Sequence, residues 1–226
     1  MAYEIATVKQ NSYLDYSEGQ ERPARSNRRG ELVQMNSIQQ FIADGRAFII
    51  NAGVATAPQT LVGAYVATTP DVYVYVPLGT TIIPLFIRVM YEAVGTESTM
   101  EIVATASVTG DSSAGGTGLT IYPMRLDNPR SSACTATVGG TVTSPNSGTF
   151  FDFWREMRPL TDTVATTEND RHGLVFEWSA LESPAPFVVG TTAGTGGSCV
   201  AIWAASQAPT GFIQFAWAEI PSTSAV

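Results

Sequence analysis

Short segments that alternate apolar and polar residues recur along this chain, and stretches rich in Gly, Thr, Ser and Pro separate them. The clearest such segment spans residues 212–221. Its alternating sets are Ile213, Phe215 and Trp217 on one face, and Gln214, Ala216 and Ala218 on the other. A period of two is the signature of a β-strand with one buried face. The pattern therefore predicts an all-β protein.

Candidate strands follow one another from residue 46 onward. They cover residues 46–54, 61–67, 72–76, 82–93, 99–109, 119–124, 134–142, 150–154, 174–180, 187–189, 199–205 and 212–220. Their number exceeds the seven strands of a minimal immunoglobulin-like sandwich, so we expect a jelly-roll-like β-sandwich with accessory strands. Pro84 should mark an edge, a bulge or a strand start. Residues 32–43 favour a short helix from Asn36 or Ser37, although a strand start fits almost as well.

The composition indicates a subunit of an assembly. Only 14% of the 226 residues are charged, against roughly 25% in an ordinary soluble domain. This is too little charge to cover the surface of a monomer in the usual way. Closed cyclic association would bury uncharged β surface and hide edge strands, so we expect a homo-oligomer, with a trimer favoured.

Residues 1–31 differ from the remainder in charge and pattern. They hold five cations and five anions and show no strand periodicity, so we interpret them as an extended N-terminal arm before a β-sandwich domain at 32–226. The arm contains a basic cluster made of Arg22, Arg25, Arg28 and Arg29. Because the whole chain has a net charge of -8, nucleic-acid binding by the domain is not expected. We expect the cluster to dock onto an acidic neighbouring subunit; the alternatives are a solvated tail and contact with nucleic acid.

The residues most often used in catalysis and metal binding are scarce. His172 is the single histidine, and Cys134 and Cys199 lie far apart without metal-site spacing. We therefore expect no metal, no cofactor and two reduced thiols. No apolar run approaches the length of a membrane span, and residues 1–6 lack the features of a signal peptide. We expect a soluble protein that is made in the cytoplasm and has no membrane partner.

One pair of carboxylates invites an enzymatic interpretation. Asp152 and Glu156 flank Trp154 within an aromatic run, and glycosidases use paired carboxylates beside aromatic residues. Arg155 and Arg158 share the segment, however, and arginines with aromatics also build subunit contacts. We favour an interface or core role for Trp154, Arg155 and Arg158, and keep a carbohydrate enzyme as the minor alternative.

The closing part of the chain resembles the end of β-sandwich virion proteins of tailed bacteriophages. It combines a Gly/Thr-rich turn at 191–197, a small-residue strand at 199–205 and an aromatic-alternating strand that ends Glu219-Ile220-Pro221. The stretch 45–53 and the Thr-rich turns between short strands are also similar.

The resemblance implies a non-enzymatic virion subunit without catalytic residues. We expect a capsid decoration, cement or minor capsid subunit, made in the host cytoplasm, which binds the major capsid protein or other virion subunits through its arm. The alternative is a tail-fibre or receptor-binding module that recognises glycans. Its candidate loop aromatics are Tyr65, Tyr73, Tyr75 and Trp203.

Overall fold

A computed structural model gives the fold of the chain. It describes residues 36–54, 56–93, 98–112, 115–142, 150–160, 175–190, 197–205 and 209–224. Contacts within the chain divide it into two units, Met1–Gln40 and Phe41–Val226. The predicted arm at 1–31 lies outside the described residues, so the description below concerns the β-rich unit and the short helix before it.

Helix α1 (Ser37–Ala43) confirms the helical interpretation of this stretch. Asn36 caps its first turn, because the Gln39 amide donates to Asn36 Oδ1 at 2.7 Å. The Gln39 side chain in turn accepts from the Asn36 amide at 3.4 Å. Such reciprocal bonds satisfy amides that have no partner inside a helix.

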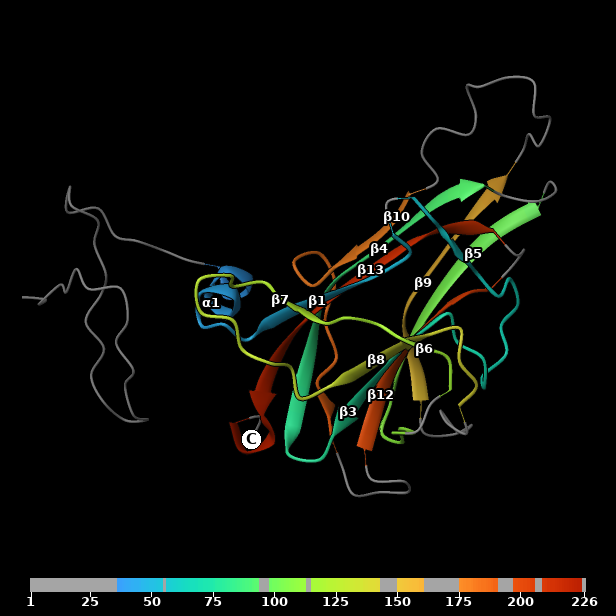
Figure 1. Ribbon diagram of the computed structural model, residues 1–226. Helices are drawn as coiled ribbons and strands as arrows, with labels where there is room; N and C mark the ends of the chain where they lie inside the picture. The colour runs from blue at the N-terminus through green and yellow to red at the C-terminus, as the bar shows by residue number, and fades with distance from the viewer. Residues whose placement is uncertain are drawn as a thin grey trace, which may run out of the picture. The chain divides into compact units, whose positions relative to one another are not determined.

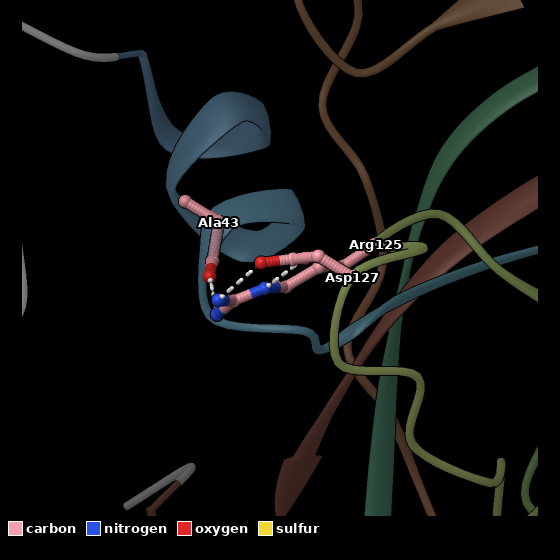
Figure 2. Close-up of polar contacts among 3 residues, drawn as sticks. All are labelled: Ala43, Arg125 and Asp127. Atoms are coloured by element: carbon pink, nitrogen blue, oxygen red, sulfur yellow. Dashed lines mark hydrogen bonds and ion pairs between the residues drawn. The ribbon is translucent and has the colours of Figure 1, made fainter.

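The far end of α1 is tied to a loop of the β-rich unit. Arg125 donates through Nη1 to the carbonyl of Ala43 at 2.7 Å and through Nε to Asp127 at 2.7 Å (Figure 2). The guanidinium also lowers the pKa of the Asp127 carboxyl through this hydrogen bond. A cation at the C-terminal end of a helix satisfies a free carbonyl and interacts favourably with the helix dipole.

The described strands form two antiparallel sheets that pack against each other (Figure 1). The strands are β1 (Ala47–Ala52), β2 (Gln59–Thr60), β3 (Val72–Pro77), β4 (Thr80–Ala93), β5 (Ser98–Ser107), β6 (Thr117–Gly118), β7 (Tyr122–Pro123), β8 (Thr135–Val138), β9 (Phe150–Leu160), β10 (Val175–Ser179), β11 (Val188–Val189), β12 (Gly197–Ala204) and β13 (Thr210–Pro221). The seven-stranded sheet has the order β10-β4-β13-β1-β7, with β11 beside β4 and β2 beside β13. The six-stranded sheet has the order β6-β8-β3-β12-β5-β9.

The order of the main strands is that of a jelly roll. Counted along the chain, the eight main strands are β1, β3, β4, β5, β9, β10, β12 and β13. One sheet then contains the first, eighth, third and sixth of them side by side, and the other contains the second, seventh, fourth and fifth. This alternation between sheets is two nested Greek keys. The expected jelly-roll-like sandwich with accessory strands is confirmed.

Strand β13 shows why the alternating pattern predicts the fold well. Ile213, Phe215 and Trp217 are fully buried between the sheets, as their shared face requires. Pro84 on neighbouring β4 lies at a bulge, because Phe86 pairs with Ala216 whereas Pro84 pairs with Trp217. Pro84 therefore marks a bulge, one of the three expected alternatives.

The expected strand at 61–67 is wrong. Instead of forming a ladder, the amide of Leu61 donates to Pro209 O at 2.9 Å and the amide of Val62 donates to Asp71 Oδ1 at 2.5 Å. Val66 continues the irregular path, since its carbonyl accepts from Thr69 in a turn. Tyr65 and Val66 of this loop contact Trp203 on the outer face of the six-stranded sheet, whereas Leu61 belongs to the main core.

That outer face carries a second, smaller apolar cluster made of Tyr73, Val142, Cys199, Ala201 and Trp203, with Tyr75 packed against it. Trp203 Nε1 donates to the carbonyl of Val66 at 2.9 Å, and the tilted ring of Tyr65 packs against Trp203 with ring centroids 5.0 Å apart. The carboxylate of Asp71 holds the loop to β12, because its Oδ2 accepts from the Ala204 amide at 2.7 Å. The loop thus buries a sheet face that would otherwise meet solvent.

Candidate interaction surface on the edge strand

Strand β9 forms an edge of the six-stranded sheet. Within the described residues it pairs only with β5, along its whole length of 11 residues. One register shift interrupts the pairing, because Trp154 lies opposite Ala104 whereas Asp152 lies opposite Thr105. Phe153 is therefore the additional residue of a β-bulge. A bulge turns the strand and changes which face the following side chains occupy.

The bulge separates the two carboxylates that suggested a glycosidase. Glu156 lies opposite Ile102, which is buried between the sheets, so Glu156 belongs to the inner side of the strand. Asp152 lies opposite Thr105, which belongs to the outer face. Two carboxylates of a glycosidase must flank one glycosidic bond. The structure does not bring Asp152 and Glu156 together on one face.

The inner side of β9 closes the open side of the sandwich. Trp154 is 9% exposed and belongs to the main core. The Arg158 guanidinium lies over the ring of Phe176 at 4.9 Å from its centroid, and its Nε donates to Glu156 Oε1 at 2.8 Å. Phe176 lies on β10, the edge strand of the other sheet, so Arg158 bridges the two sheet edges. A cation over an aromatic ring is attracted by the negative face of the ring.

The outer side of β9 carries exposed ion pairs beside Met157, which lies opposite Glu101, whereas the exposed Phe151 lies opposite the buried Ala106 on the inner side. Arg155 Nη2 donates to Asp152 Oδ2 at 2.8 Å, and Arg155 Nε lies 3.4 Å from Glu101 Oε1. Burial raises the pKa of Tyr65, and Asp152 raises it further, which places Tyr65 near this ion pair. Such exposed ion pairs add little stability.

Two large apolar side chains of β9 are exposed, Phe151 at 56% and Met157 at 58%. Arginine, methionine and aromatic residues are enriched at protein interfaces, and an edge strand also presents unpaired backbone groups. We call the surface formed by Phe151, Asp152, Arg155, Met157 and Arg158 the edge surface.

The predicted interface residues fall into three groups. Arg155 and Arg158 are partly exposed on the edge surface. Trp154 is buried in the core, so its contribution to a contact is to support the strand. The basic cluster Arg22, Arg25, Arg28 and Arg29 lies outside the described residues, as does His172.

Two of the four aromatics expected to bind glycans from loops are buried in strands. Tyr73 is 2% exposed and Trp203 is fully buried, so the prediction is wrong for both. Tyr75 is partly buried against the same cluster, and Tyr65 is 39% exposed. The reason is that loop 61–71 covers their sheet face.

The two thiols are buried and have low reactivity. Cys134 and Cys199 are free cysteines. Burial raises the pKa of Cys199 to about 12, and burial together with the nearby Glu219 carboxylate raises that of Cys134. A thiol that stays protonated is a poor nucleophile and a poor metal ligand. In the described part of the chain, no three His, Cys, Asp or Glu residues are grouped so that they could hold a metal ion.

No described helix has the length and apolar character needed to cross a membrane. Comparisons with protein-family models, with curated proteins and with solved structures gave no match.

Proposed function

We propose that the protein is a non-enzymatic structural subunit of a virus particle, which associates with copies of itself and with other capsid subunits. The observation that carries the proposal is the jelly-roll strand order, which is characteristic of viral capsid domains and also occurs in lectins. This step is an analogy at the level of the fold, and a fold by itself does not determine function. The edge surface supplies the independent support.

The edge surface fits a contact between subunits better than it fits catalysis. It presents an edge strand, Arg155 and Arg158, and exposed Phe151 and Met157 on a chain with few charged residues. Asp152 and Glu156, the candidate catalytic pair, are each paired with an arginine and lie on opposite sides of β9.

Light scattering of the purified chain tests self-association, for which we expect a homo-oligomer, most simply a trimer. Met157→Asp adds a charge to the edge surface and should shift the protein toward monomer. Leu126→Asp is the matched control, because Leu126 is 83% exposed and lies far along the chain from β9. A monomer at every concentration, or equal effects of the two variants, would contradict the proposal.

Electron microscopy tests the virion assignment. We expect the chain to form closed shells by itself or to decorate shells formed by another capsid protein. Removal of residues 1–31 should leave a folded domain that no longer attaches to particles. Particles that contain the truncated chain at the same level as the full chain would show that the arm is not the anchor.

A further inference from the structure

A groove of about 740 Å³ lies away from the edge surface, where β1 and β13 pair in the seven-stranded sheet. Its floor includes Asn51, Gln214 and Phe212. One wall includes Gly53, Val54, Ala57 and Pro58, and Tyr122 on β7 also lines the groove. The volume is in the range of small-molecule sites.

Two amide side chains on the floor hold each other in place. Asn51 lies opposite Gln214 across the β1–β13 pairing, and Gln214 Nε2 donates to Asn51 Oδ1 at 2.9 Å. This bond leaves the Asn51 amino group as a donor and Gln214 Oε1 as an acceptor. Neither has a protein partner among the residues that the structure describes. An adjacent donor and acceptor match two neighbouring hydroxyl groups, each of which both donates and accepts.

The wall of the groove is formed before any ligand arrives. Gly53 has a φ of +86° and turns the chain away from β1. A Cβ at this position would lie 2.8 Å from Phe212 Cδ1, so only glycine fits without a shift. Val54 and Ala57 then exchange two backbone hydrogen bonds of 2.9 Å, which close the turn. A preformed wall lowers the entropic cost of binding.

The remaining lining selects against charged ligands. None of the described residues that line the groove is an Arg, Lys, His, Asp or Glu. Arg88 lies opposite Gln214 on β4, but its guanidinium is paired with Glu177 and it is not among the lining residues. The described lining therefore offers no charged side chain to a phosphate, an acidic sugar or a basic peptide. Tyr122 is 50% exposed and lies opposite Ile49, which makes it the diagonal neighbour of Asn51. Its ring can meet the apolar C–H face of a sugar while the amides meet the hydroxyls.

We propose that this groove binds an uncharged oligosaccharide. Asn51 and Gln214 bind hydroxyl groups and Tyr122 supplies the stacking surface. The inference goes beyond the structural role proposed above, because the groove and the edge surface have no residue in common.

Isothermal titration calorimetry of the full chain tests the proposal with four neutral probes, namely maltotetraose, cellotetraose, mannotetraose and chitotetraose. We expect at least one to bind, with heparin and a basic peptide as negative probes. The double variant Asn51→Ala and Gln214→Ala should weaken binding at least about tenfold, because the hydrogen bonds of both amides to the sugar are lost. Tyr122→Ala should weaken it comparably, whereas Tyr122→Phe should retain most of the affinity.

Leu126→Ala is the control, because Leu126 is 83% exposed and is not among the residues that line the groove. It should leave the affinity unchanged, and all variants should keep the oligomer size and unfolding midpoint of the natural chain. Absence of binding to all four tetrasaccharides, or binding that survives the double variant, would overturn the proposal. Preferential binding of either negative probe would overturn it as well. Light scattering of the same samples tests the assembly role separately.

Discussion

Replacement of Trp217 by alanine should destabilise the domain by about 3–5 kcal/mol. The side chain is fully buried, and its ring centroid lies 5.2 Å from that of Phe215 and 6.4 Å from that of Phe48. A buried tryptophan removes roughly 200 Å² from water, which at about 25 cal/mol per Å² corresponds to about 5 kcal/mol. The expected loss of stability is smaller than this value, because alanine still buries part of the area and the unfolded chain is itself partly compact. The cavity left by the tryptophan ring adds to the loss, and the upper end of the range of about 3–5 kcal/mol allows for it.

Trp217→Phe separates the packing from the polar contribution. Trp217 Nε1 donates to Glu219 Oε1 at 3.0 Å, and Glu219 keeps its bonds from Ser132 and the Ala133 amide when this donor is removed. We therefore expect a loss of about 1–2 kcal/mol for phenylalanine. Urea denaturation followed by circular dichroism gives both values, with Leu126→Ala as an exposed control that should change stability by less than about 0.5 kcal/mol. A loss below about 1 kcal/mol for Trp217→Ala would show that the inward face of β13 is assigned incorrectly.

Three further predictions concern buried groups and the groove wall. Burial raises the pKa of Asp71 to about 6, above its unfolded value of 3.8, so the protonated carboxyl favours the folded state. The contribution of Asp71 to stability should therefore fall by about 3 kcal/mol as the pH rises from below 3.8 through about 6. Urea denaturation of the natural chain and of Asp71→Asn across this pH range should show the loss. Cys134 and Cys199 should resist an aromatic disulfide reagent in the folded protein and react after denaturation, because both are buried; labelling of the folded protein would contradict this. Gly53→Ala should cost about 1–3 kcal/mol in a thermal or urea denaturation experiment, since its φ is +86°.

The fold could be predicted largely because the main core is built from strands with one buried face. Phe176 and Trp178 on β10 are buried while Glu177 between them is exposed, as alternation requires. The pairing of the strands could not be predicted in the same way. The contacts between β13 and β4, for example, join residues more than 100 positions apart, and local periodicity carries no information about such distances.

The second apolar cluster shows where the alternating pattern does not distinguish a buried face from an exposed one. In β5, Met100 and Ile102 lie on one face of the strand, and Val103 and Thr105 lie on the other. One apolar and one polar residue on this second face suggest an outer face of mixed polarity. Both Val103 and Thr105 are fully buried, because loop 61–71 and its neighbours cover the outer face. A sheet that is covered on both sides has no exposed face for the pattern to report. For the same reason the sequence suggests that Trp203 is exposed and able to bind a ligand, whereas the structure shows that its side chain is buried.

The groove could not be predicted from the sequence, because no residue pattern in the sequence indicates it. Asn51 and Gln214 are ordinary outward positions on their strands, and only the antiparallel register of β1 and β13 places them opposite each other. Neither residue type has a spacing rule comparable to that of a metal site. The sequence alone therefore predicts an uncharged surface. The register of β1 and β13 is what places two amide side chains together as a candidate binding pair.

The bulge at Phe153 determines which side of β9 each carboxylate of this segment occupies. In a regular strand, Asp152 and Glu156 are four residues apart and would lie on one face, which is the arrangement that the sequence suggested. One additional residue between them changes the parity, so Glu156 joins Arg158 on the inner side while Asp152 joins Arg155 on the outer side. Bulges follow from the twist and pairing of the sheet rather than from a local sequence signal. A residue pattern within an edge strand therefore predicts a paired site only once its register is known, and here the register favours two separate ion pairs at an interaction surface.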